Sequence, residues 1–376
     1  MKVKKQMASL GLLVVMGVSL LAGCGGETAT PTAVAGTDTN ANTSGAAPTT
    51  APGGAATTVA SCTTMDKLKL QLKWLHQAQF AGYYVAADKG YYKERCLDVE
   101  LLPGGPDVVP SQKVLTGAAD VGIDWVGSTL ANRDKGQPLI DIGQFYQTSG
   151  LYLISKKTAG ITSPKDLKGK KVGVWTGGNE FEFRALMDKY GFDNSIDNNK
   201  DMTVIKQGFE MDTFLNDKLD AASAMVYNEY NVVLEAGVKP DDLNVINYNV
   251  EGVGMLEDHV FTTEQNVKDK KDLLVRFLAA AQKGWITAIK DENAGVEATM
   301  ARVDKSTTNR DHQVSMMREV AKLVIPPNST SDKVGFIDPD RFRTTADIAL
   351  KFKVISKPAQ DAYTNDLIQA AAALNQ

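Results

Sequence analysis

Residues 67–102 read KLKLQLKWLHQAQFAGYYVAADKGYYKERCLDVELL, and this stretch decides the fold class. Residues 67–72 alternate polar side chains with leucine, which predicts a half-buried strand. Phe80 to Gly90 is typical of a helix that ends at a glycine. Leu97 to Leu102 predicts a second strand, closed by the turn Pro103-Gly-Gly-Pro106. A strand, a helix and a strand in this order indicate a parallel α/β unit.

The same alternation continues outward from this unit. We expect further strands at residues 119–123 and 139–145 and helices at 111–116 and 128–135. A second run begins at Ser163-Pro164, a helix start with proline at its first position, and predicts strands at 171–175, 202–205 and 221–226 with helices at 180–190 and 211–216. Beyond Gly254 we expect helices at 273–289, 312–324 and 359–374. The pattern predicts two α/β lobes with mixed, mostly parallel sheets, and C-terminal helices packed on the first lobe.

The first 23 residues predict a secretory signal peptide. Lys2, Lys4 and Lys5 precede an apolar stretch from Ala8 to Leu21, which is shorter than the roughly 20 apolar residues of a spanning helix. Leu21-Ala-Gly-Cys24 matches a bacterial lipobox, whose cysteine receives diacylglycerol and becomes the mature N-terminus. We therefore expect a lipid anchor at Cys24 on the extracytoplasmic face of a cell membrane. An ordinary signal peptide with an incidental cysteine is the alternative.

Residues 24–64 are expected to form a disordered linker behind the lipid. Residues 25–61 are almost entirely Gly, Ala, Thr, Pro, Ser and Asn, without an aromatic residue, so they cannot bury enough apolar surface to fold. About 310 residues remain, which exceeds one typical core and predicts two lobes. The net charge of −4 and the scattered basic residues exclude nucleic acid as an expected partner.

The chain has three cysteines. If Cys24 is lipidated, Cys62 and Cys96 remain as an even pair in an oxidising exterior, and each lies just before a predicted strand of one sheet. We expect a disulfide between them; two thiols that never meet are the alternative. With so few cysteines and histidines and no metal-ligand spacing, we expect no metal and no cofactor.

Four stretches resemble the substrate-binding proteins related to thiamine-pyrimidine synthase. They are Trp74-Leu-His-Gln-Ala-Gln-Phe-Ala-Gly-Tyr-Tyr-Val-Ala86, Gly90-Tyr-Tyr-Lys-Glu94, Thr116-Gly-Ala-Ala-Asp-Val-Gly122 and Asp166-Leu-Lys-Gly-Lys-Lys-Val-Gly173. The resemblance implies the type II periplasmic binding fold, in which two lobes close on ligand like a clamshell. It places the two crossovers near Thr148 to Tyr152 and Gly252 to Glu257. Lobe I then comprises residues 65–150 and 256–376, and lobe II comprises residues 151–255.

The resemblance also implies a function: an extracytoplasmic solute-binding protein, expected as a monomer, that hands its cargo to an ABC permease. Relatives carry thiamine pyrimidine precursors, riboflavin or organic anions such as sulfonates. The eukaryotic synthase relatives are enzymes with a cysteine-rich iron-binding motif, which this chain lacks. No Ser/His/Asp or Cys/His arrangement is visible either, so we expect no enzyme. A pyrimidine-synthase-like enzyme and a ligand sensor for a membrane kinase are the alternatives.

The expected ligand site lies where the strands end, because open α/β folds bind ligands at the carboxyl ends of their strands. The first strand is followed by Trp74, His76, Gln77 and Phe80, and the third by Asp124 and Trp125. In the second lobe the corresponding residues are Trp175 and Asn179 after one strand and Tyr227, Asn228 and Glu229 after another. By resemblance, the Trp74 segment and the Asn228-Glu229 pair are where relatives contact ligand.

Aromatic side chains at these strand ends favour a planar heterocycle, because offset stacking contributes about 0.5–1.5 kcal/mol per pair beyond burial. An anionic cargo would favour arginine, and the nearest, Arg133 and Arg184, lie within predicted helices. Three tryptophans offer more stacking surface than one pyrimidine ring needs, so riboflavin ranks above a thiamine pyrimidine precursor. Core packing is the alternative for Trp74 and Trp175.

Some polar residues near the site have plain structural alternatives. His76 can cap the following helix instead of binding ligand. Gly177-Gly178 can bind an anion through backbone N–H groups or simply form a tight turn. His259 and His312 show no ligand spacing and are expected to be structural or surface residues.

Overall fold

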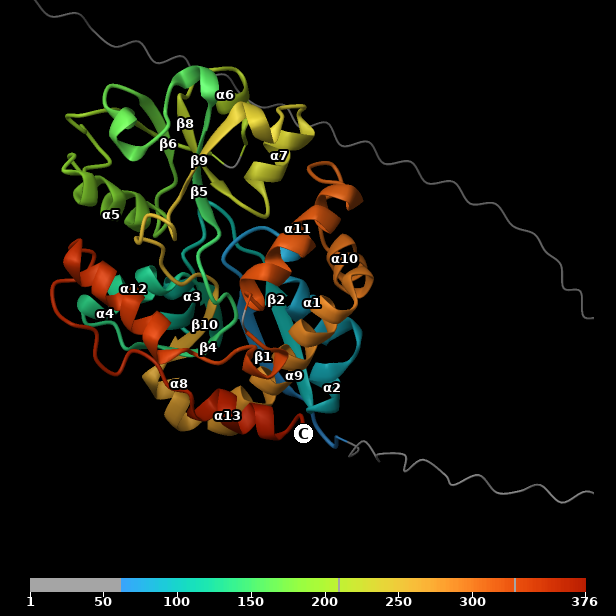
Figure 1. The fold of residues 1–376 in the computed structure, drawn as a ribbon. Helices are drawn as coiled ribbons and strands as arrows, with labels where there is room; N and C mark the ends of the chain where they lie inside the picture. Colours follow the sequence, from blue (N-terminus) through green and yellow to red (C-terminus); the bar gives the residue numbers. More distant parts are fainter. Residues whose placement is uncertain (1–61, 209, 328) are drawn as a thin grey trace, which may run out of the picture. The chain divides into compact units, whose positions relative to one another are not determined.

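The computed structural model describes residues 62–208, 210–327 and 329–376. The predicted signal peptide, the lipobox with Cys24 and the linker up to residue 61 lie outside the described residues. Two five-stranded sheets, each covered by helices, organise the described part, which confirms the predicted two-lobed α/β fold (Figure 1). We call the first sheet with its helices lobe I and the second sheet with its helices lobe II.

The sheet of lobe I has the strand order β2-β1-β3-β10-β4. Its strands are β1 (Asp66–Gln71), β2 (Leu97–Leu102), β3 (Val121–Asp124), β4 (Leu139–Gln144) and β10 (His259–Thr263). The sheet of lobe II has the order β7-β6-β8-β5-β9. Its strands are β5 (Leu151–Lys156), β6 (Lys171–Val174), β7 (Thr203–Lys206), β8 (Ala221–Met225) and β9 (Leu243–Asn247).

Parallel pairing does not predominate among the described strands. In lobe I β1 pairs parallel with β2 and β3, but β10 pairs antiparallel with β3 and β4. In lobe II β6 pairs parallel with β7 and β8, but β5 pairs antiparallel with β8 and β9. The sequence analysis identified neither β5, β9 nor β10.

The chain passes between the two sheets twice. Residues 145–150 join β4 to β5, and residues 248–258 join β9 to β10. We call these two crossovers the hinge. Strands β5 and β10 each follow a crossover directly, so each sheet is connected to the hinge by one of its antiparallel strands.

Most helices cover lobe I. They are α1 (Ala81–Asp88), α2 (Tyr91–Glu94), α3 (Pro110–Leu115), α4 (Val126–Asp134), α8 (Glu264–Asp269), α9 (Lys271–Lys290), α10 (Glu292–Met300), α11 (Arg310–Val324), α12 (Pro339–Lys351) and α13 (Asp366–Ala373), with the 3₁₀ turn η1 (Ala78–Phe80) before α1. Lobe II carries α5 (Glu180–Tyr190), α6 (Asp212–Leu215) and α7 (Glu229–Glu235). The residues after Ser163, expected to begin a helix, form only the 3₁₀ turn η3 (Pro164–Leu167).

The C-terminal helices pack on lobe I, as predicted. Helix α9 lies against α1, α13 against α9 and α12 against α4. The crossing of α1 and α9 is so close that a Cβ on Gly82 would lie 2.1 Å from the ring of Trp285. Trp285, the one tryptophan not expected at the ligand site, is therefore a core residue.

The helix predicted at 359–374 is only half right. Residues 366–373 form α13, but the residues before Asp366 run along β4 instead. The Asp141 N–H donates to the Ala362 carbonyl at 3.0 Å, and the Thr364 N–H donates to the Asp141 carbonyl at 3.0 Å. The Ala362 carbonyl and the Thr364 N–H are thus hydrogen-bonded to the edge of the sheet and are not available for hydrogen bonds within a helix.

A disulfide joins Cys62 to Cys96. Cys96 directly precedes β2, and Cys62 lies shortly before β1, so the bond closes the N-terminal edge of the parallel pair. No helix among the described residues is long and apolar enough to cross a membrane.

Candidate functional site

Two adjoining cavities lie where β1, β3, β6 and β8 end. The smaller measures about 40 Å³ and is lined by Lys73, Trp74, Gln77, Gln79, Trp125, Trp175, Asn179, Met225, Tyr227, Asn228 and Glu229. The larger measures about 350 Å³ and shares with it Lys73, Trp74, Trp175 and Asn179. Both cavities are lined by residues of both lobes, so they form one cleft.

The structure brings most of the predicted site residues to this cleft. The smaller cavity is lined by Trp74, Gln77, Trp125, Trp175, Asn179, Tyr227, Asn228 and Glu229, and Asp124 lines the larger one. They meet because parallel strands of a sheet present their carboxyl ends at one edge.

Two predicted residues lie away from both cavities. Phe80 is fully buried in the core of lobe I. The His76 ring contacts Tyr84, whose hydroxyl lies 2.9 Å from Nδ1, and burial together with the charge of Arg302 lowers the pKa of His76. Neither side chain lines the cleft, so we drop both from the candidate site.

Lys73 occupies the centre of the cleft and was missed from the sequence. Its Nζ donates to Asp124 Oδ1 at 2.7 Å and to the Gly177 carbonyl of lobe II at 3.2 Å. The side chains of Lys73 and Asp124 are only 11% and 4% exposed. An ammonium has three N–H donors, so one remains for a ligand after these two contacts. Lys73 lies next to Trp74 and shortly after β1, at the strand end where the other site residues were predicted, and this position could have identified it from the sequence.

Asp258 anchors the wall of the cleft from the second crossover. Its carboxylate accepts from Trp125 Nε1 at 3.1 Å and from Gln79 Nε2 at 2.7 Å, and Gln77 Nε2 donates to Gln79 at 2.7 Å. Burial raises the pKa of Asp258 to about 7, against the opposing effects of the Gln79 hydrogen bond and the Lys73 charge. The indole of Trp125 is thus held in place by a side chain from the hinge.

On the side of lobe II, Trp175 and Glu229 are also fixed by hydrogen bonds. Trp175 Nε1 donates to the Gly208 carbonyl at 2.8 Å. Glu229 accepts from the Met225 N–H at 3.0 Å and from Asn228 Nδ2 at 2.7 Å. Burial raises the pKa of Glu229 to about 7, so this carboxyl can take up or release a proton near neutral pH beside the ligand.

Two more buried carboxyls lie at the hinge. Glu257 accepts from Ser149 Oγ at 2.9 Å and from the Gly150 N–H at 3.0 Å, which ties one crossover to the other. Glu182 of α5 accepts from the Met255 N–H at 2.5 Å. Burial raises the pKa of Glu182 to about 8, and burial together with the charge of Glu182 raises that of Glu257.

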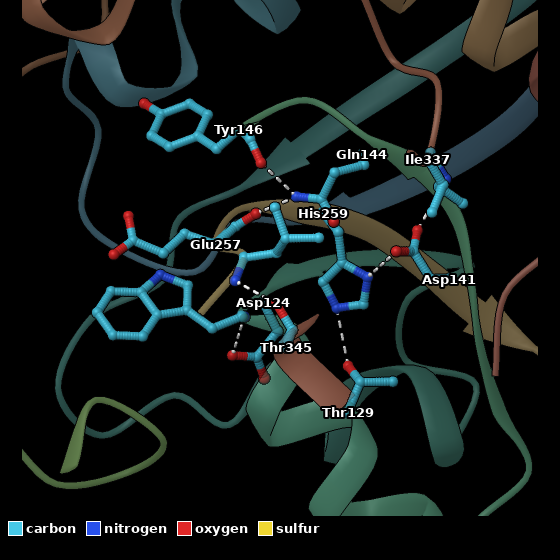
Figure 2. Close-up of polar contacts among 12 residues, drawn as sticks. Asp124, Thr129, Asp141, Gln144, Tyr146, Glu257, His259, Ile337 and Thr345 are labelled. Atoms are coloured by element: carbon cyan, nitrogen blue, oxygen red, sulfur yellow. Dashed lines mark hydrogen bonds and ion pairs between the residues drawn. The ribbon is translucent and has the colours of Figure 1, made fainter. Parts of the chain in front are cut away.

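A Thr/His/Asp arrangement that the sequence did not predict lies buried between α4, β4 and β10 (Figure 2). His259 Nε2 lies 2.8 Å from Thr129 Oγ1, and its Nδ1 lies 3.2 Å from Asp141 Oδ2. All three residues are at most 2% exposed and line neither cavity of the cleft. A hydroxyl that no substrate can reach is no nucleophile, so this arrangement ties α4 to β4 and β10.

The larger cavity has a polar lining in which positive and negative side chains are equal in number. The larger cavity is lined by Lys73, Lys135 and Lys206 against Asp107, Asp124 and Glu180, and by hydroxyl and amide side chains from Ser111, Gln112, Ser128, Asn132, Thr176 and Gln207. No arginine lines either cavity. Within the described ranges, no three His, Cys, Asp or Glu side chains are placed to hold a metal ion.

Comparison with protein families gives a match over most of the two lobes. Residues 77–294 match the family described as NMT1/THI5 like. The riboflavin-binding protein RibY of Chloroflexus aurantiacus is 22% identical over 377 residues, covering 97% of this chain and 98% of that protein. A formylaminopyrimidine-binding protein of Halalkalibacterium halodurans is 22% identical over 259 residues, covering 66% of this chain and 76% of its own.

Partial and structural likenesses accompany these relatives. A 4-amino-5-hydroxymethyl-2-methylpyrimidine phosphate synthase of Saccharomyces cerevisiae is 28% identical over 159 residues, which cover 42% of this chain and 45% of the synthase. The crystal structure of the periplasmic aliphatic sulphonate binding protein SsuA from Escherichia coli superposes with a TM-score of 0.60 at 13% identity, over 79% of this chain and 91% of that one. At this identity the structural likeness supports the fold alone.

Proposed function

We propose that this chain, which belongs to the NMT1/THI5-like family as its four sequence stretches predicted, is a solute-binding protein of the ABC-import type. Its proposed cargo is a planar aromatic vitamin, with riboflavin as the first candidate. The observation that carries this proposal is the meeting of Trp74 and Trp125 of lobe I with Trp175 and Tyr227 of lobe II around one cavity. Rings from both lobes can stack on one flat ligand and hold the lobes together.

The larger cavity supports a ligand with a polar extension. Pockets for small molecules typically measure about 300–1,000 Å³, and the larger cavity measures about 350 Å³ next to the aromatic one. Its hydroxyl and amide lining and its balanced charges fit an uncharged hydroxylated chain such as the ribityl group. The aromatic cavity of about 40 Å³ is too small for a ring system, so entry of the ring must move the lobes or the indoles apart.

A formylaminopyrimidine or another thiamine pyrimidine precursor is the second candidate. The relative from Halalkalibacterium halodurans favours it, and so do the amides Gln77 and Asn179 and the carboxyl Glu229 in the smaller cavity, which can pair with amino and ring nitrogens. A pyrimidine-synthase-like enzyme is disfavoured, because the synthase match covers 42% of this chain and the Thr129 hydroxyl is buried.

Titration of the full chain with riboflavin and, separately, with formylaminopyrimidine tests the cargo. We expect saturable quenching of tryptophan emission by riboflavin at sub-micromolar concentration, because the three cleft tryptophans would stack on the ring or lie beside it. The variant Trp285→Phe, which removes only the core tryptophan, should keep this response. Saturation by the pyrimidine alone would replace the first candidate with the second, and no response to either would exclude both.

The proposed location is the outer face of a cell membrane, where the chain meets its permease as a monomer. The motif Leu21-Ala-Gly-Cys24 supports lipidation, and the disulfide between Cys62 and Cys96 fits an oxidising compartment. Labelled fatty acid should be incorporated into the wild type and not into Cys24→Ser. Equal labelling of the two would contradict a lipid anchor at Cys24.

A further inference from the structure

His312 bridges the two lobes away from the hinge. It lies in the first turn of α11 in lobe I, where the Asn309 side chain accepts from its backbone N–H at 3.0 Å. Its Nδ1 lies 3.0 and 3.1 Å from the two carboxylate oxygens of Glu235 in lobe II. Its Nε2 lies 2.9 Å from Asn228 Oδ1, also in lobe II. The residue is 5% exposed, so one buried imidazole spans the interface between α11 and α7.

This bridge continues into the ligand cleft. Asn228 and Glu235 are seven residues apart, so they lie about two turns apart on one face of α7. Asn228 contacts His312 through its carbonyl and donates through Nδ2 to Glu229 at 2.7 Å. Glu229 also accepts from the Met225 N–H. Asn228, Glu229 and Met225 line the smaller cavity, so an unbroken chain of hydrogen bonds runs from the lobe interface to the ligand.

We propose that His312 is a positioning residue that holds the lobes together in the closed state and, through its contact with Asn228, fixes Asn228 and Glu229 in the ligand cleft. The proposal rests on the proposed function only in assuming that the lobes open and close around a ligand. Lys73, which donates to the Gly177 carbonyl, joins the lobes at a second place. Lys73 contacts lobe II at a backbone carbonyl, whereas His312 contacts two of its side chains, Glu235 and Asn228.

Separation of the lobes breaks both contacts that His312 makes with lobe II. Other charges on α11 around His312 are engaged elsewhere or face solvent: Arg310 pairs with Glu297, Arg318 with Glu292 and Lys322 with Glu319, while Asp311 is exposed. From η1 the Ala78 N–H donates to the uncharged Gln313 side chain near the start of α11.

Small-angle scattering of the full chain without ligand tests the lobe contact directly. We expect His312→Ala to give a larger radius of gyration than the wild type, because both contacts with lobe II are lost. His312→Gln, whose amide can still contact one of the two partners, should give an intermediate value. Arg318→Gln, on the same helix and paired within lobe I, is the matched control and should behave like the wild type.

Ligand binding separates this proposal from the choice of cargo. With riboflavin as the probe, we expect the dissociation constant of His312→Ala to rise at least about tenfold. Glu235→Gln, on a half-exposed side chain, should raise it less and serves if His312→Ala fails to fold. Variant-dependent scattering without riboflavin binding would keep this proposal and overturn the cargo. Riboflavin binding with identical scattering and affinity in wild type and variants would overturn the role of His312.

Discussion

Gly178 of lobe II packs directly on Ser128 of lobe I: a Cβ on Gly178 would lie 2.0 Å from the Ser128 hydroxyl oxygen. Real Cβ atoms do not approach so closely, so no side chain fits between the lobes at this point. The Gly177-Gly178 pair therefore includes a point of close contact between the lobes. Gly178 is required by this contact, and both glycines have positive φ angles, 92° and 117°.

We therefore predict that Gly178→Ala prevents full closure. The dissociation constant for the ligand should rise at least about tenfold, which corresponds to about 1.4 kcal/mol. Gly177→Ala is the matched control, because Gly177 shares the positive φ but has open space around its added Cβ. Calorimetric titration of both variants measures the difference. Equal losses in the two variants would mean that backbone strain, and not contact between the lobes, sets the affinity.

The buried pair of Lys73 and Asp124 predicts a non-additive effect on stability. Lys73→Met leaves the Asp124 carboxylate buried without its cation, and breaking such a pair costs about 3–5 kcal/mol. The double variant with Asp124→Asn has no unpaired charge and should recover more than half of the lost free energy of unfolding. Urea denaturation of wild type, both single variants and the double variant gives the coupling. Additive losses would show that the two side chains act independently.

Glu182 predicts a pH dependence of stability. Burial raises its pKa to about 8, whereas an unfolded glutamate titrates near about 4.3. Between these values the folded chain holds a proton that the unfolded chain has lost. The free energy of unfolding therefore falls with rising pH, by up to about 1.4 kcal/mol per pH unit for one such group.

Glu182→Gln should make this fall less steep by the share of one carboxyl, because the glutamine carbonyl still accepts from the Met255 N–H and no longer titrates. The other buried carboxyls with raised pKa values, Asp258, Glu229 and Glu257, keep the remaining slope. Thermal unfolding between about pH 5 and pH 8 measures the slope. Asp188→Asn, on the same helix with a partly exposed side chain, should keep the slope of the wild type. A slope in Glu182→Gln as steep as that of the wild type would place the titrating proton elsewhere.

The disulfide closes a loop with a sequence separation of 34 residues. A cross-link of this size restricts the unfolded chain and stabilises the fold by about 3–4 kcal/mol. Reduction of the wild type, or the double variant Cys62→Ser/Cys96→Ser, should lower the midpoint of thermal unfolding by several degrees. An unchanged midpoint after verified reduction would mean that the bond adds nothing to the stability of β1 and β2.

The sequence was most informative at the ends of the parallel strands. Trp74, Trp125, Trp175 and Tyr227 each follow such a strand, and shared sheet geometry brings them together without knowledge of the loops. Phe80 was misplaced because the chain turns into η1 before it, which directs the side chain into the core.

What the sequence could not provide depends on the crossovers and the distant helices. Strand β10 arrives antiparallel from residues 248–258, and the local pattern does not reveal its neighbours. Asp258 in this crossover and His312 in α11 contact the cleft residues Trp125 and Asn228 and lie far from them along the chain. The buried contact of Thr129, His259 and Asp141 likewise joins three separate elements.

Calorimetric titration of riboflavin into the wild type, Trp74→Leu and Trp175→Leu tests the central claim, that aromatic side chains from both lobes hold one planar ring. Trp285→Phe is the control, because Trp285 lies in the core of lobe I. We predict that the wild type and the control bind alike, while each cleft variant weakens binding at least about tenfold. Undiminished binding in either cleft variant would contradict the claim that both lobes stack on the ligand.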